Sequence, residues 1–319
     1  MLRSLIIKLL VRGINFFQLP SGGGDRTPAK NKKNTAESYN EAPMMSVCLQ
    51  FFNKRENIEL IWKNLTKCGA DEIIIQEDGS SDGSLSKWAS LAIGKNHFVI
   101  RSNDLFEVRT YDRSIDYARG KYVALLQDDD IPPPSSRWVD EAIYLFEKFD
   151  DLAIIGGLSG ASLLTLGGSK QVTDESRYSV VDDIAEYPGV FRYRIKKEPE
   201  KLVDGIQFEF SEYVNRAPMF VRKSFFKELG GIDQSFAPFQ CDDVDLCLKA
   251  WQAGYKVGLV KSPFARNVGI GGMRLYNRNA PNIVENWKRI YAKYGVLIDE
   301  GYFSDKVSDA NRRLTSNLQ

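Results

Sequence analysis

Apolar runs of strand length alternate with helix-like segments along the chain from Met44 onward. The run at 122–126 is rich in aromatic and β-branched residues and does not alternate with polar ones, as in a strand covered on both faces. Strands are expected at 44–52, 71–80, 97–101 and 122–126, and helices at 57–68, 84–93 and 107–119. Because such alternation builds βαβ units, the sequence predicts an α/β fold with a mainly parallel, doubly wound sheet.

The N-terminal residues 1–19 have the pattern of an amphipathic helix. Their apolar residues fall on one helical face, and Lys8 and Arg12 lie on the opposite face. The stretch is too short and too interrupted by charge to span a bilayer. Two interpretations stay open, namely peripheral contact with a membrane surface and docking on a protein surface. Residues 20–43 have the composition of a flexible linker, so the folded domain is expected to begin near Met44.

Composition argues against several classes of function. The chain has 319 residues and a formal net charge of +1, which gives no global electrostatic reason to expect a nucleic-acid partner. The cysteines show neither a CxxC motif nor a zinc-type spacing, and His97 is the only histidine. A zinc site and a histidine-based catalytic triad are therefore disfavoured. We interpret the cysteines as reduced thiols of a cytoplasmic protein.

Three adjacent carboxylates, Asp128–Asp130, follow the expected strand at 122–126 in the stretch "YVALLQDDDIPPP". The prolines Pro132–Pro134 cannot continue a sheet and turn the chain away at this point. Ligands of open α/β sheets bind at the carboxyl ends of the strands. A divalent cation such as Mg²⁺ or Mn²⁺ would offset the repulsion between these carboxylates. A solvated acidic turn is the alternative for this stretch taken alone.

Two further acidic sites follow the same logic. Asp78 lies in "QEDGSSDGS" at the end of the expected strand 71–80, where a carboxylate can accept a hydrogen bond from a base or a ribose hydroxyl. An ordinary Asp-Gly turn is the alternative reading of this stretch. Asp242 and Asp243 precede an amphipathic helix, and Asp242 is a candidate cap. Since a helix N-terminus favours the anionic form of a carboxylate, a lowered pKa is expected there, which suits a general base. A capping pair with a surface-exposed Asp245 is the alternative.

Taken in order, four blocks of the chain resemble family 2 glycosyltransferases of the GT-A fold. The blocks are "SVCLQFFNKRENI", "EIIIQEDGSSDGS", "ARGKYVALLQDDDIPPP" and "FVRKSFFKELGGIDQSFAPFQCDDVDLCLKAWQAGYKV". The resemblance spans roughly residues 44–265, and it implies a GT-A (Rossmann-like) domain with an acceptor-side half. It also implies transfer of a sugar from a nucleotide diphosphate sugar, often a UDP-sugar, to an acceptor hydroxyl with inversion.

The resemblance assigns roles to individual residues. Asp243 would be the catalytic base, with Asp242 in place of the family's Glu. Asp129 would be the metal ligand and Asp128 would lie near the ribose, whereas a shifted register makes Asp130 the ligand. The nucleotide would be bordered or bound by Gln50, Phe51, Phe52, Asn53 and Asp78.

The sequence departs from the family pattern at two places. Tyr111 and Asp112 stand where many relatives have an Arg-Asn pair, although Arg109 and Arg113 are close enough in sequence to serve the phosphates. Relatives often supply a metal-binding histidine after the last core strand, and Asn267 stands at about that position here. An amide oxygen is an acceptable but poorer ligand for Mn²⁺ or Mg²⁺.

Two regions remain for acceptor recognition and closure. The irregular region 158–215, rich in Tyr, Phe and charged residues, is where we expect the acceptor, whose nature as a glycan, a lipid-linked sugar or a protein stays open. The C-terminal extension 266–319 either folds over the donor as a lid or packs on the sheet. A catalytically inactive nucleotide-sugar binding protein on the same fold is the alternative function.

Overall fold

The computed structural model describes residues 43–164, 179–187, 189–216, 218–266 and 276–316. The chain divides into two units, residues 1–40 and residues 41–319, and all of the described residues belong to the second. The predicted helix at 1–19, nearly all of the predicted linker and Asn267 lie outside the described residues. Within the described part, no helix combines the length and the apolar character that crossing a membrane requires.

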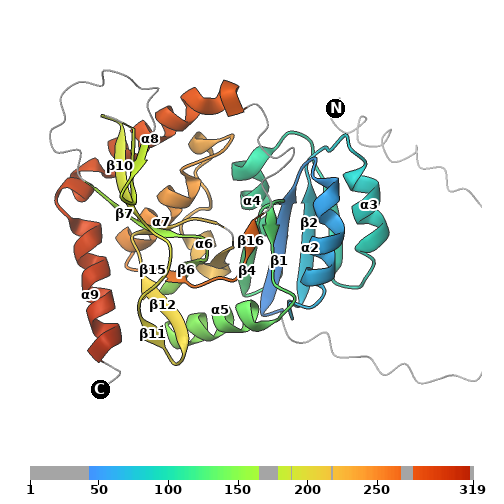
Figure 1. Ribbon diagram of the computed structural model, residues 1–319, viewed down its shortest axis with the longest axis horizontal. Coiled ribbons are helices and arrows are strands. Elements are labelled where there is room, and N and C mark those ends of the chain that lie inside the picture. The colour runs from blue at the N-terminus through green and yellow to red at the C-terminus, as the bar shows by residue number, and fades with distance from the viewer. Residues whose placement is uncertain (1–42, 165–178, 188, 217, 267–275, 317–319) are drawn as a thin grey trace, which may run out of the picture. The chain divides into compact units, whose positions relative to one another are not determined.

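Nine of the described strands form one sheet in the order β11-β12-β15-β6-β14-β4-β1-β2-β3 (Figure 1). They are β1 Met45–Phe51, β2 Glu72–Glu77, β3 His97–Arg101, β4 Tyr122–Leu126, β6 Leu152–Gly156, β11 Leu202–Val203, β12 Ile206–Phe210, β14 Met219–Arg222 and β15 Lys256–Val260. Strands β4, β1, β2 and β3 run parallel to one another, and β15 runs parallel to β6. Strand β14 lies antiparallel between β4 and β6. The predicted α/β fold with its large, mainly parallel sheet is confirmed.

Helices cover this sheet and explain its unbroken apolar runs. They are η1 Arg55–Asn57, α2 Ile58–Leu65, α3 Ser84–Leu91, α4 Phe106–Tyr117, α5 Arg137–Lys148, α6 Lys223–Glu228, η2 Gln234–Phe236 and α7 Asp242–Gln252. Every residue of β1, β2, β4 and β6 is buried, so both faces of these strands are covered. A strand buried on both faces needs apolar residues at successive positions rather than at alternate ones.

The described structure also contains a second sheet and two long C-terminal helices (Figure 1). The sheet has the order β13-β7-β10-β9-β8, with β7 Gly160–Leu163, β8 Ser179–Val181, β9 Ile184–Tyr187, β10 Phe191–Lys196 and β13 Tyr213–Val214. Helix α8 (Tyr276–Asp299) packs on β10, where the Trp287 ring stacks on that of Phe191 at 4.2 Å. Helix α9 (Tyr302–Ser316) packs on β12, and Asn311 exchanges two hydrogen bonds with the backbone of Phe210.

In its described part, the C-terminal extension therefore packs on strands β10 and β12. Residues 267–275 of this extension lie outside the described residues, so the alternative of a lid over the donor stays a prediction.

Candidate functional site

The parallel strands bring the predicted acidic sites to one edge of the sheet. In the β1–β2 ladder Phe51 pairs with Glu77, and in the β1–β4 ladder Leu49 pairs with Leu126. The residues that follow these three strands are therefore neighbours, as the carboxyl ends of parallel strands must be. The main-chain N–H of Phe52, after β1, donates a hydrogen bond of 3.0 Å to Asp128, after β4.

Lys54 is a buried cation beside the acidic run Asp128–Asp130, and no sequence pattern predicted it there. Its side chain is only 3% exposed. Its Nζ lies 3.0 Å from Asp128 Oδ1 and 3.8 Å from Asp129 Oδ2. Burial raises the pKa of Asp128 to about 6, against the opposite effect of Lys54. Lys54 therefore offsets part of the cost of burying two adjacent carboxylates.

Arg266 is a second cation beside the acidic run, where it contacts Asp129 and Asp130. The short strand β16 (Ala265–Arg266) pairs antiparallel with β5 (Asp130–Ile131), with Arg266 opposite Asp130. Arg266 Nη2 donates to both oxygens of Asp129 at 2.8 Å and to Gln127 Oε1 at 2.9 Å. Its Nε lies 3.4 Å from Asp130 Oδ1. Two protein cations thus already face the three carboxylates.

The acidic run can hold a divalent cation only together with other ligands. No group of three or more His, Cys, Asp or Glu side chains in the described part of the chain has the spacing of a metal site. Asp129 and Asp130 nevertheless lie side by side, and the buried Asp130 Oδ1 has no hydrogen-bond partner. Since Mg²⁺ is often bound by one or two carboxylates plus substrate phosphates, these residues fit an ion that arrives with a diphosphate.

The predicted nucleotide-binding residues differ in what they contact. Asp78 is fully buried, and its oxygens accept hydrogen bonds from Ser102 Oγ at 2.8 Å and from two main-chain N–H groups at 2.9 Å. These donors hold the loop before α4, so this geometry favours a role for Asp78 in shaping the loop. Phe51 is also fully buried and packs edge-on against Trp88 at 5.2 Å. Its side chain belongs to the core because it points to the α3 face of β1.

Phe52 and Asn53 remain partly exposed at the strand ends, whereas Gln50 is buried at 8% exposure. Asn53 holds the Gly-Ser turn after β2, because its Oδ1 accepts from Ser81 N at 2.8 Å and its N–H donates to Ser80 Oγ at 3.0 Å. This turn and the Asp128 loop are therefore tied to the end of β1.

The pair Asp242 and Asp243 begins α7, and two expectations about it were wrong. The cap position belongs to Cys241, at φ 66°, and no side chain caps the helix. Asp242 instead forms an ion pair with the buried Arg216. The pKa of Asp243 is raised to about 6 rather than lowered, since burial outweighs the attraction of Arg216.

Asp245 is buried as well, at 1% exposure, and is not the surface residue of the alternative reading. Its carboxylate pairs with Lys293 and, at 3.2 Å, with Lys249, and it accepts from Tyr294 Oη at 2.7 Å.

Glu107 joins the helix-start pair Asp242–Asp243 to the acidic run. It accepts a hydrogen bond of 3.0 Å from Gln127 Nε2, and its other oxygen lies 3.7 Å from Arg216 Nη1. Burial raises the pKa of Glu107 to about 7, although Arg216 acts in the opposite direction. The acidic sites after β4 and at the start of α7 thus belong to one connected site.

The residues around α4 occupy two opposite faces of that helix. Arg109 and Arg113 are exposed, on the face opposite Tyr111, and the structure does not bring them into the connected site. Tyr111 is fully buried and donates to Leu126 O at 3.3 Å, and Asp112 accepts from Ile232 N at 2.9 Å. Among the described residues, the basic side chains that face the carboxylates of this site are Lys54, Arg216 and Arg266.

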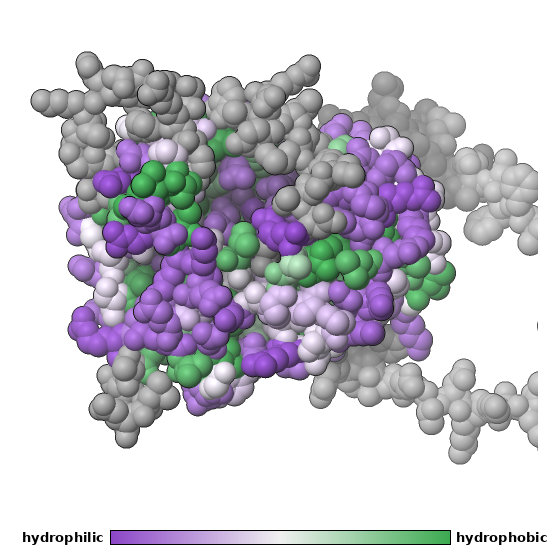
Figure 2. Space-filling view, in the orientation of Figure 1, coloured by the Kyte–Doolittle hydropathy of each residue, from purple (hydrophilic) through white to green (hydrophobic). Residues whose placement is uncertain are grey.

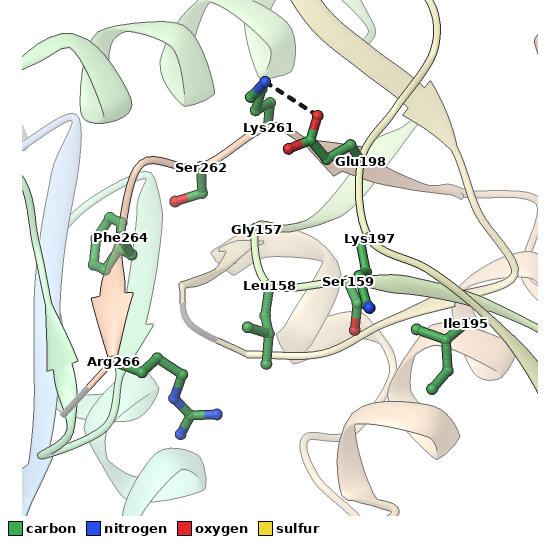
Figure 3. Close-up of a pocket in the computed structure, with 10 residues that line it drawn as sticks. All are labelled: Gly157, Leu158, Ser159, Ile195, Lys197, Glu198, Lys261, Ser262, Phe264 and Arg266. Atoms are coloured by element: carbon green, nitrogen blue, oxygen red, sulfur yellow. Dashed lines mark hydrogen bonds and ion pairs between the residues drawn. The ribbon is translucent and has the colours of Figure 1, made fainter. Parts of the chain in front are cut away.

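A pocket of about 420 Å³ opens next to Arg266 (Figure 3). Its walls come from the β6–β7 loop, from the end of β10 and from the segment after β15, including Ser159, Lys197 and Phe264. Lys261 and Glu198 form an ion pair of 3.1 Å at its rim. Figure 2 shows hydrophilic residues inside a recess on the face of the molecule drawn there. The pocket has charged, hydroxyl and aromatic groups within reach of one ligand.

Comparison with known proteins identifies the class. The described fold is that of GT-A glycosyltransferases. The sequence model for glycosyl transferase family 2 matches residues 46–205, which is half of the chain, and the chain belongs to this family. A search of curated proteins found no match.

Among solved structures, that of GalNAc-T7 with UDP, GalNAc and Mn²⁺ aligns with a TM-score of 0.58 and 14% identity. The alignment covers 82% of this chain and 50% of that chain, so this protein spans about half the length of GalNAc-T7. At this identity the likeness concerns the fold alone.

Two other structures match at lower TM-scores, from which nothing further follows. The mannosyltransferase PcManGT from Pyrobaculum calidifontis, in complex with GDP-Man and Mn²⁺, has a TM-score of 0.48 and 11% identity over 85% of this chain and 74% of that one. TarS 1–349 from S. aureus has a TM-score of 0.43 and 14% identity, covering 69% of this chain and 59% of that one.

Proposed function

We propose that the protein transfers a sugar from a UDP-sugar to an acceptor hydroxyl, with inversion at the anomeric carbon. Membership of glycosyl transferase family 2 supports the reaction class. The structure of GalNAc-T7 contains UDP and Mn²⁺, and its shared fold is our reason for proposing UDP and a divalent cation here.

The observation that carries this proposal is the chain of contacts between the acidic run and the helix-start pair. Gln127, Glu107 and Arg216 connect the two in successive contacts of 3.0 Å and 3.7 Å and an ion pair with Asp242. A single displacement at a sugar needs a charged site for the leaving diphosphate and one base for the acceptor. Two carboxylate sites built into one network match that requirement.

On the donor side, Asp129, or Asp130 in the shifted register, would hold Mn²⁺ or Mg²⁺, with Asn267 as a further proposed ligand. The ion supplies electrostatic stabilisation to the diphosphate when it is bound. Lys54 and Arg266 are the protein's own cations at this point, and both lie within 4 Å of Asp129. An ion held by Asp129 would offset the charge of that carboxylate, and Arg266 would then be available to the phosphates. Asp128 is proposed to lie near the ribose.

On the acceptor side, Asp243 is the proposed base. A carboxyl group whose pKa is about 6 is mostly ionised at neutral pH and is a stronger base than an exposed aspartate. Asp243 would take the proton of the acceptor hydroxyl as that oxygen attacks the sugar. Asp242, paired with Arg216, would orient it.

The acceptor is proposed to bind over the region 158–215. Ser159, Lys197 and Glu198 of this region line the pocket beside Arg266 (Figure 3). A cytoplasmic location, with residues 1–19 as a peripheral membrane contact, completes the proposal.

A panel of nucleotide sugars tests the proposed donor. Thermal unfolding is recorded with each nucleotide sugar, with and without Mn²⁺. A donor present at 100 times its dissociation constant should stabilise the protein by about 2.7 kcal/mol. Release of UDP from the donor that binds then separates an active transferase from an inactive nucleotide-sugar binder. Arg266 already binds both oxygens of Asp129, and this contact favours the alternative function, an inactive nucleotide-sugar binding protein.

A further inference from the structure

Arg216 is a buried cation at the centre of the connected site. It follows β13, and its residue is 6% exposed. Its guanidinium pairs with Asp242, lies 3.7 Å from Glu107 and sits over the ring of Tyr111, 4.5 Å from the ring centroid. A planar guanidinium engaged on two edges and one face is fixed in both position and orientation.

The contacts of Arg216 reach both halves of the site. On one side, Asp242 is the immediate neighbour of Asp243 at the start of α7. On the other side, Tyr111 donates to the carbonyl of Leu126, the last residue of β4, at 3.3 Å. One side chain therefore touches the elements that position the acidic run and those that position the helix-start pair.

We propose that Arg216 is the positioning residue of the transfer reaction, which fixes Asp242 beside Asp243 and couples this pair to the end of β4 through Glu107 and Tyr111. This inference rests on the proposed function, in which Asp243 takes the acceptor proton. Arg216 acts through Asp242 and Asp243, and its effect should appear in the charge state of Asp243.

Several charged and titratable groups act on Asp243 or on its surroundings. They are Arg216, Asp242, Glu107, Tyr213, Cys241 and Cys247, with Asp245, Lys249 and Lys293 on the next turn of α7 and on α8. Burial raises the pKa of Asp243, Arg216 lowers it, and Asp242 raises it. Removing the positive charge of Arg216 should therefore move the pKa of Asp243 upward, and removing the negative charge of Asp242 should move it downward.

The test is the pH dependence of UDP release from the donor that binds, measured for the wild type and for Arg216→Met, Arg216→Lys and Asp242→Asn. A charged neighbour shifts a pKa by about 1–3 units. A rise of about two units would leave roughly a tenth of Asp243 ionised at pH 7, so kcat for Arg216→Met should fall about tenfold there and recover at higher pH. Arg216→Lys keeps the charge but loses the planar guanidinium, which can bind two partners at once. For this variant kcat should fall at every pH. The acid limb, meaning the pH at which activity falls on the acid side of the profile, should stay near its wild-type position. Asp242→Asn should move the acid limb to lower pH.

Two results would overturn the inference. One is an Arg216→Met enzyme that is slower by the same factor at every pH, with the acid limb unmoved. Arg216 would then contribute only to the packing of the site. The other is a raised KM for the donor with an unchanged limb, which would make Arg216 a phosphate ligand.

If Arg216→Met does not fold, Asp242→Asn carries the test, and an acid limb that stays in place or moves upward overturns the inference. A wild-type protein that binds UDP-sugars but never releases UDP contradicts the proposed function as well as the inference. An active wild type with unmoved limbs contradicts the inference alone.

Discussion

Replacing Lys54 with Met removes the only charge of this side chain while keeping most of its length. Lys54 is 2% exposed and lies 3.0 Å from Asp128, whose side chain is 8% exposed. Breaking a buried ion pair from one side leaves an uncompensated charge and usually costs about 3–5 kcal/mol. We therefore expect Lys54→Met to lower the free energy of unfolding by about that amount at pH 7.5. Urea unfolding measures it, with the midpoint and slope fitted separately.

The loss should depend on pH in a defined direction. The folded-state pKa of Asp128, about 6, lies above its unfolded value, so this carboxyl costs stability at neutral pH and the cost disappears as pH falls. Without Lys54 that pKa should rise further. Between pH 7.5 and 5.5 the deficit of Lys54→Met should then shrink by roughly 2 kcal/mol, because each pH unit of protonation is worth about 1.36 kcal/mol.

Two further variants make this prediction sharp. Adding Asp128→Asn to Lys54→Met removes the stranded charge and should restore at least half of the lost stability at pH 7.5. Lys87→Met, which breaks an ion pair with the exposed Glu59, is the matched control and should change little. A loss below about 1 kcal/mol for Lys54→Met, or a deficit that does not depend on pH, would show that Lys54 is hydrated and not a buried partner of Asp128.

Three other predictions concern the metal, the N-terminus and the C-terminal helices. Asp129→Ala should abolish divalent-dependent UDP binding in calorimetry, and unchanged affinity would move the ligand to Asp130 or remove the ion from the scheme. Deleting residues 1–20 should leave an active domain that sediments less with anionic liposomes, whereas a full-length protein that ignores liposomes contradicts membrane contact. Trp287→Ala should cost about 3–5 kcal/mol in urea unfolding, as aromatic deletions in a core do, and exposed Val296→Ala should not.

The sheet was predictable where a strand consists of a short apolar run bounded by polar residues. The runs expected at 97–101 and 122–126 coincide with β3 and β4, and the one at 44–52 contains β1. The antiparallel insertion of β14 between β4 and β6 was not predicted, because pairing between distant segments leaves no local periodicity. The edge where the acidic sites meet was predicted correctly, since parallel strands place their carboxyl ends together.

The cations of the site were not predictable in the same way. Lys54 lies 74 residues from Asp128 in sequence, and Arg216 lies 109 residues from Glu107. A single basic residue in a loop shows no sequence pattern that predicts a carboxylate partner so far away along the chain. The expected fall in the pKa of Asp243 was wrong for a related reason. The sequence predicts the helix N-terminus, which lowers the pKa of a nearby carboxyl. The burial that raises the pKa of Asp243 outweighs this effect, and it depends on segments that are distant in sequence.

The central claim is that Asp243 is the base, and Asp243→Asn tests it most directly. The amide keeps the size of the side chain and its ability to accept from Val244 N at 3.0 Å, but it cannot take a proton at neutral pH. Donor binding should survive, while transfer falls by about 10²–10⁴-fold, the usual worth of general base catalysis. Asp242→Asn, the matched control, should cost less. Transfer at the wild-type rate by Asp243→Asn, or a larger loss in Asp242→Asn, would contradict the assignment.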